Sequence, residues 1–193
     1  VDAGYSANSF LYIFDFNDKQ FAEMEYTIPI FNAGKVSASS VEGSSFFNWK
    51  DYHIHIENQM EDRSHRLIVN SKDKKGNHIE ADVNIKEIGE PIVNSREVLP
   101  GRVVYTHQNS MCRPEGSITW NNRTYPLSPK EDFAGMDFTQ GLHAYYTTWN
   151  WACAGGYAED GTPLAINFAM DIDEGSNNVV LYWIDKTIYR LPE

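Results

Sequence analysis

The sequence contains no apolar run of about 18 residues, the length that a membrane-crossing helix requires. It also contains no basic run. Asp and Glu number 27 against 16 Lys and Arg, which gives a net charge of −11. That excess of negative charge argues against binding nucleic acid or an anionic membrane through a general basic surface. No signal peptide is recognisable. We therefore expect a cytoplasmic protein that spans no membrane and binds no nucleic acid.

Cysteine is scarce as well. Cys112 and Cys153 lie far apart and form no Cys-x-x-Cys pair, so the sequence predicts no redox centre and no zinc site. Two reduced thiols are the favoured interpretation, and one disulfide remains an alternative.

His53 and His55 lie two residues apart on one strand face and could be metal ligands, but Glu57 continues that face, which indicates an exposed polar surface. We expect no metal and no cofactor.

Helical periodicity is nearly absent. The one candidate is a turn or two of helix at 128–139, where Ser128 could cap and Pro129 could take the first helical position. Everywhere else, apolar residues alternate with polar ones, which is typical of half-buried strands. In 21–30, for instance, Ala22, Met24 and Ile28 share a face. The predicted strands are 9–16, 21–30, 43–49, 52–58, 65–70, 78–87, 102–108, 116–121, 123–127, 143–158, 162–170, 178–184 and 187–191.

Short strands separated by turn signals predict an all-β, antiparallel barrel or sandwich. Hairpin turns are expected at Lys50-Asp51, Asn121-Asn122, Asp160-Gly161 and Asp185-Lys186. The aromatic content changes near 128–135. We therefore predict two β units, a first at 1–130 and a second at 131–193 that comprises a linker and further strands.

Aromatic side chains concentrate at 136–151, "MDFTQGLHAYYTTWNW". In an extended strand, Tyr145, Trp149 and Trp151 share one face, while Tyr146, Thr148 and Asn150 share the other. Each face combines large rings with hydrogen-bonding groups. Such a face suits the wall of a cavity for a mainly apolar ligand with a polar end. The alternative is a core strand whose Tyr and Trp side chains reach polar partners at the rim.

Asp137 is the only charged residue of this segment. Beside Met136 and Phe138 it could be partly desolvated, and burial raises the pKa of a carboxyl, so that it could act as a general acid. The alternative is a turn or cap in which Asp137 accepts hydrogen bonds from backbone amides near Thr139 and Gln140.

The segment 136–171 resembles the domain of unknown function 2804 family. The pattern is carried by Asp137, Phe138, Thr139 and Gly141, then by Thr147, Trp149, Asn150, Trp151 and Ala152, then by Asp160, Gly161 and Asn167. The segments 40–47, 115–127 and 178–191 are similar to further parts of the family, so the resemblance covers nearly the whole chain. It implies that Asn167 belongs to the ligand site. Tyr146 stands where the family has an Arg that would grip an anion or orient Asp137. Lys186 stands where the family has Gly.

"MDFTQG" is also similar, more distantly, to a motif of the lipocalin-like hydroxyneurosporene synthase (carotenoid hydratase) group. That resemblance implies lipocalin-like β units and a role for Asp137 as a general acid. Since members of the first family are longer at both ends, it also implies a second unit that is incomplete in this chain. Further segments or a partner chain would then complete the sheets.

Three functions are open at this point. The first is a protein that binds a hydrophobic or amphipathic small molecule in an aromatic-lined cavity. The second is a lyase, hydratase or isomerase acting on such a ligand with Asp137 as general acid. The third is a structural module completed by another chain through open sheet edges. The predicted ligand-binding residues are Tyr145, Tyr146, Thr148, Trp149, Asn150, Trp151 and Asn167. The loss of the Arg at position 146 favours binding over catalysis.

Overall fold

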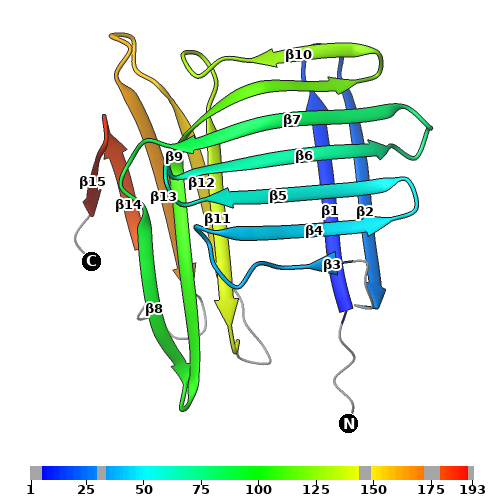
Figure 1. Ribbon diagram of the computed structural model, residues 1–193. Coiled ribbons are helices and arrows are strands. Elements are labelled where there is room, and N and C mark those ends of the chain that lie inside the picture. The colour runs from blue at the N-terminus through cyan, green and yellow to red at the C-terminus, as the bar shows by residue number, and fades with distance from the viewer. Residues whose placement is uncertain (1–5, 30–33, 144–148, 172–178, 191–193) are drawn as a thin grey trace. The chain divides into compact units, whose positions relative to one another are not determined.

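The computed structural model describes residues 6–29, 34–143, 149–171 and 179–190 (Figure 1). In these ranges the chain is all-β, every strand pairing that we describe is antiparallel, and no sheet closes into a barrel. The prediction of an antiparallel all-β fold is therefore confirmed. The strands are β1 (Ser6–Asp15), β2 (Gln20–Pro29), β3 (Gly34–Lys35), β4 (Gly43–Trp49), β5 (Tyr52–Gln59), β6 (Ser64–Lys72), β7 (His78–Glu87), β8 (Ile92–Leu99), β9 (Arg102–Trp120), β10 (Arg123–Leu127), β11 (Ala134–Gly141), β12 (Trp149–Tyr157), β13 (Pro163–Asp171), β14 (Val179–Ile184) and β15 (Thr187–Arg190). The part of the chain described here holds no helix with the length and apolar content needed to cross a membrane.

The chain forms two compact units that interleave along the sequence. Unit 1 comprises residues 1–84 and 115–127, and unit 2 comprises 85–114 and 128–193. Strands β7 and β9 pass from one unit into the other, because each contains residues of both. The single division after residue 130 that we expected from the sequence stays a prediction.

Unit 1 contains a sheet in the order β10-β9-β7-β6-β5-β4-β3, to which β9 contributes its last residues. Its tight turns contain residues with a positive φ. Lys50 has φ 53°, and Asn121 and Asn122 have φ 54° and 60°. Two consecutive left-handed residues form the turn whose twist matches paired strands, and Asn is among the few side chains that accept this conformation. The predicted hairpins at Lys50-Asp51 and Asn121-Asn122 are confirmed.

Asp73 organises the connection between β6 and β7. Its carboxylate accepts hydrogen bonds from the backbone amides of Lys75 at 2.8 Å and Asn77 at 2.9 Å. It also accepts bonds from the Asn77 side chain at 2.9 Å and from the Trp120 indole at 3.2 Å. Burial alone would raise the pKa of Asp73, but these hydrogen bonds outweigh burial and hold the pKa below 3.8.

The hairpin β1–β2 forms a two-stranded sheet that runs across the strands of the larger sheet of unit 1 (Figure 1). Its inner face is apolar and buried: Ala22, Met24 and Ile28 are 0–5% exposed, as the alternation in 21–30 predicted. The Ser9 hydroxyl lies 2.9 Å from the Tyr52 hydroxyl, and the Tyr125 hydroxyl donates to Asp15 at 2.6 Å. These polar contacts fix the hairpin on the sheet.

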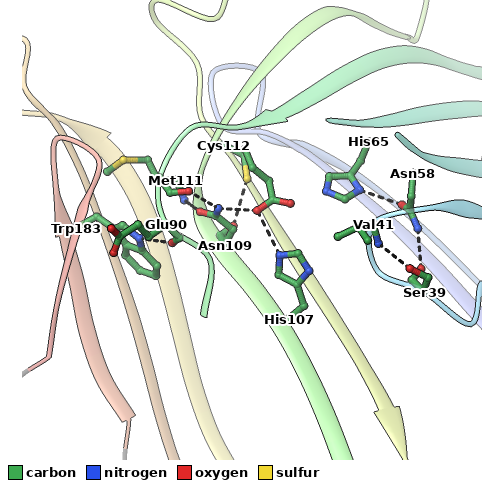
Figure 2. A network of polar contacts seen from close by, with 12 residues as sticks. Ser39, Val41, Asn58, His65, Glu90, His107, Asn109, Met111, Cys112 and Trp183 are labelled. Atoms are coloured by element: carbon green, nitrogen blue, oxygen red, sulfur yellow. Dashed lines mark hydrogen bonds and ion pairs between the residues drawn. The ribbon is translucent and has the colours of Figure 1, made fainter. Parts of the chain in front are cut away.

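Unit 2 contains the sheet β12-β13-β14-β15 and a layer in which β9 pairs with both β8 and β11. Met111 of β9 packs with the inward side chains of the C-terminal sheet in the core of the unit, which comprises Met111, Ala165, Leu181 and Trp183, with Ile88, Ile92, Phe133 and Ile188 against it. The Trp183 indole donates to the carbonyl of Glu90 at 2.8 Å, so that the buried ring leaves no polar atom unpaired (Figure 2).

The structure differs from the predicted elements in several places. The expected helix at 128–139 is wrong: residues 128–132 form a turn closed by Ser128 and Asp132, and β11 follows. Strand β8 was not predicted, because its sequence alternates only weakly. The predicted strands 102–108 and 116–121 are parts of one strand, β9.

Candidate functional site

The family-pattern residues Asp137 and Asn167 lie on neighbouring layers of unit 2. Asp137 of β11 is the cross-strand partner of Gln108 on β9. In the other sheet, Cys153 of β12 is the partner of Asn167 on β13. Directly opposed residues of an antiparallel pair project from the same face, so Asp137 shares a face with Gln108, and Cys153 shares one with Asn167. Trp151 joins the second pair because it lies two residues from Cys153.

A hydrogen-bond relay joins the two layers. The Trp151 indole donates to Asn167 Oδ1 at 2.7 Å, and Asn167 Nδ2 donates to Gln108 Oε1 at 3.1 Å. Asn167 is fully buried, whereas Trp151 is 45% exposed. A buried amide is costly unless both of its ends are paired, and here both are. The relay therefore fixes the orientation of a ring that presents almost half of its surface to solvent.

Asp137 is exposed and receives a hydrogen bond from the Thr139 hydroxyl at 3.4 Å. The expected desolvation of this carboxyl is wrong: Asp137 shares the face of Gln108, yet its side chain is exposed. The expected turn or cap is also wrong, since Asp137 lies inside a strand and accepts its hydrogen bond from the Thr139 hydroxyl rather than from a backbone amide. Within the described ranges, Asp137 forms no ion pair.

The Cys153 thiol lies within electrostatic reach of Asp137. Partial burial raises the pKa of Cys153, and the negative charge of Asp137 raises it further. A thiol with a raised pKa stays protonated at neutral pH and is a weak nucleophile. Both cysteines are free, Cys112 being buried and Cys153 exposed. We call the set Trp151, Cys153, Asn167, Gln108 and Asp137 the relay site.

Not all of the other predicted ligand-binding residues belong to the relay site. Asn150 is exposed and projects from the face opposite to Trp151. Trp149 is described only as the first residue of β12, paired with Asp171. Tyr145, Tyr146 and Thr148 lie outside the described residues. Sequence reasoning missed Gln108, because no local pattern marks a single glutamine in a strand.

A second polar cluster lies on the other face of β9 and was also missed (Figure 2). Asn109 Nδ2 donates to Glu87 Oε2 at 2.8 Å and to the Gly89 carbonyl at 3.1 Å, and His107 Nε2 lies 3.3 Å from the same Glu87 oxygen. The side chains of Glu87 and His107 are only 1% and 4% exposed. The signal that could have found this cluster is the unbroken polar run 106–110, which begins inside the predicted strand 102–108.

The same cluster supports an irregularity of β9. Between Asn109 and Cys112, β9 has one residue more than β11, which is a β-bulge. A bulge leaves backbone groups without ladder partners, and Asn109 Oδ1 accepts the amide of Met111 at 2.9 Å. The Cys112 thiol donates to the Asn109 carbonyl at 3.4 Å. The bulge shifts the alternation of side chains between the two faces of β9, and this shift directs Met111 into the core.

The arrangement of histidines and acids does not form a metal centre in the described part of the chain, where no three such side chains come together. His107 contacts Glu87. His53 contacts Asn48 at 3.1 Å, and His55 lies 3.9 Å from Glu57.

Comparison with known proteins identifies a family. The sequence matches the family described as Domain of unknown function (DUF2804) over residues 1–193. No curated protein matches the chain, and no solved structure matches it. The match spans the whole sequence, including both layers of the relay site. The chain therefore belongs to the DUF2804 family.

Proposed function

We propose that this protein binds a hydrophobic or amphipathic small molecule at the relay site, in the manner of a lipocalin-like carrier. The supporting observation is the Trp151 indole, which is held by the buried Asn167 while 45% of the residue is exposed. A ring fixed before binding loses little conformational entropy when a ligand packs on it. Asp137 and Cys153 add a charge and a polar atom near this ring, which suits a ligand with a polar end.

Binding without chemistry is favoured over catalysis. The lyase, hydratase or isomerase alternative rests on the resemblance of "MDFTQG" to the carotenoid hydratase motif and requires Asp137 as general acid. General acids of this type are tuned by burial in apolar surroundings, and Asp137 is exposed. The raised pKa of Cys153 likewise disfavours a thiolate nucleophile.

The third alternative, a module completed by another chain, is supported by the open sheets. No sheet of the described residues closes, and β1–β2 pair only with each other there. Open edges can be completed by strands of a partner. Size-exclusion chromatography with light scattering tests this alternative, and a strict monomer in every preparation would reject it.

The binding proposal is tested by native mass spectrometry of protein purified from its own source and by titration with the neutral fluorescent probe N-phenyl-1-naphthylamine. We expect Trp151→Ala to weaken probe binding by about tenfold, since it removes an aromatic contact worth roughly 1–1.5 kcal/mol. Trp49→Ala is the matched control, because Trp49 is also an exposed tryptophan but lies in unit 1. Equal effects of the two substitutions would contradict the proposal.

Asp137→Asn separates binding from catalysis. If the protein only binds, the variant retains a co-purifying ligand in unaltered chemical form, as the wild type does. If the ligand is recovered as product from the wild type and as substrate from the variant, the enzyme alternative replaces the binding proposal.

A further inference from the structure

The outer face of the hairpin β1–β2 carries a column of exposed aromatic rings. Side chains at alternate positions of β1 project away from the buried face, and Phe21 of β2 joins them opposite Phe14. The exposed fractions of this set lie between 44% and 87%, and its members are Phe10, Tyr12, Phe14, Phe16 and Phe21. Soluble proteins seldom expose contiguous rings in this way unless the surface has a partner.

The rings are ordered among themselves. Phe14 stacks on Phe16 with centroids 6.2 Å apart and on Phe21 with centroids 6.0 Å apart, while Phe10 lies 5.5 Å from Tyr12. Alternate residues of a strand are about 6.8 Å apart along its axis, so the rings follow one another at close to the repeat of an extended chain. The face therefore matches a partner segment that is itself extended.

Carboxylates lie beside the rings. The pairing register places Glu23 opposite Tyr12 and Glu25 opposite Phe10, so both acids project from the aromatic face. Asn8 Nδ2 lies 3.4 Å from Glu25 Oε1, which orients that side chain. Within the described residues, neither acid forms an ion pair. The hairpin 6–29 contains Asp15, Asp18, Glu23 and Glu25 against one base, Lys19 in the turn. Arg123 of β10 forms ion pairs with Asp15 and Asp18 and so neutralises part of their charge.

Rings next to unpaired carboxylates form the environment that a cation prefers. Arginine in particular stacks on aromatic faces and donates to carboxylates at the same time. A second copy of this chain is a poor occupant, because it would bring the same acids against each other and each copy carries a net charge of −11. An anionic membrane is excluded by the same charge. We propose that the β1–β2 face binds an extended, basic segment of a partner protein, with Arg or Lys at alternate positions.

The test uses a fluorescently labelled peptide that alternates Arg with Thr, titrated by anisotropy. A peptide that alternates Glu with Thr is the charge control, and one with its Arg residues clustered is the pattern control. We expect the alternating Arg peptide to bind and the Glu peptide not to bind, and we expect the clustered peptide to bind more weakly. Equal binding of the alternating and clustered peptides would overturn the proposed extended geometry.

Two pairs of substitutions locate the site. Glu23→Gln with Glu25→Gln should weaken binding about tenfold, while Glu61→Gln with Glu80→Gln changes the net charge equally at exposed positions elsewhere and should have little effect. Phe10→Thr with Phe14→Thr should abolish binding, with Val36→Thr and Met60→Thr as the exposed apolar control. Thermal unfolding shows whether each variant is folded. If the Phe→Thr variants do not fold, the comparison of the two Glu→Gln pairs decides whether the β1–β2 face is the binding site.

Three results would overturn the proposal. The first is equal loss of binding in the two Glu→Gln pairs, which indicates attraction by net charge alone. The second is concentration-dependent dimerisation that Phe14→Thr abolishes, which assigns the face to a second copy. The third is co-sedimentation with phosphatidylcholine vesicles in place of peptide binding, which assigns it to a membrane surface.

Discussion

At the scale of the residue, Gly116 is the position where the backbone of unit 1 leaves no room for a side chain. Its φ is 135°, and a Cβ built on it would lie 2.1 Å from the carbonyl oxygen of Asp82. Real carbon and oxygen atoms do not approach so closely, and the obstacle is backbone rather than a flexible side chain. Glycine is therefore required where β9 passes β7.

We expect Gly116→Ala to lower the free energy of unfolding by roughly 3 kcal/mol or more, because the strands must separate to admit the methyl group. Gly76→Ala is the control: Gly76 also has a positive φ, 88°, but no atom lies within 4 Å of its Cβ position. That variant should lose only about 1 kcal/mol through backbone strain. Urea unfolding followed by Trp fluorescence measures both, and equal losses would show that crowding at Gly116 is unimportant.

Asp73 provides a second prediction at this scale. Because its pKa is lowered in the folded protein, its contribution to stability is present above the ordinary value of 3.8 and is lost as the pH falls through the lower folded value. Asp73→Asn must place an amide NH₂ against the Asn77 or Trp120 donors, and we expect a loss of about 2 kcal/mol at pH 7. The difference between wild type and variant should shrink below about pH 4. A difference that stays constant from pH 7 to pH 3 would contradict this account.

At the scale of the element, turns were the part of the fold most readily predicted from the sequence. Asn121 and Asn122 both adopt a positive φ, and Asn121 also donates to Gln20 at 3.2 Å. We expect Asn122→Gly to raise the free energy of unfolding by roughly 0.5 kcal/mol, since glycine has no Cβ to strain in this conformation. Asn122→Val should lower it by about 1–2 kcal/mol. Differential scanning calorimetry measures both, and a stabilising valine would rule out the left-handed turn.

Elements defined by distant partners could not be predicted. The residues at 128–132 carry the local signals of a helix start, but the same groups close a turn: Ser128 accepts from the amides of Glu131 and Asp132, and Asp132 accepts from that of Ser128. Strand β11 forms because β9 offers it a ladder, and β9 is far away in the sequence. Pairing over such separations leaves no periodic trace in a short segment.

The candidate site shows the same limit. The resemblance to the family identified Trp151 and Asn167, and the structure joins them directly. Gln108 completes the relay from another sheet, and nothing in its sequence neighbourhood distinguishes it. Asp137 was expected to be desolvated because of its apolar neighbours, yet alternation along β11 places Met136 and Phe138 on the opposite face and leaves the carboxyl exposed. Adjacent residues in a strand do not share an environment.

At the scale of the whole molecule, charge is the dominant property. Twenty-seven acids against 16 bases repel one another in the compact state. We expect the midpoint of thermal unfolding to rise as NaCl increases from about 10 mM to 150 mM, because the Debye length falls from about 30 Å to 8 Å. Sucrose at matched osmolality is the control for effects other than screening. A midpoint that falls with salt would show that the ion pairs, such as Arg66 with Asp82 at 2.8 Å, outweigh the repulsion.

The bond between Tyr125 and Asp15 joins residues 110 positions apart. A ribosome releases residues in order, so the first hairpin is made long before the strand that will anchor it. Until β10 emerges, the apolar face of β1–β2 that the folded protein buries stays exposed to water, in addition to the aromatic face on the other side of the hairpin. We therefore expect the growing chain to aggregate most readily between the synthesis of β2 and that of β10, and a chaperone that shields nascent polypeptide would bind within residues 6–29.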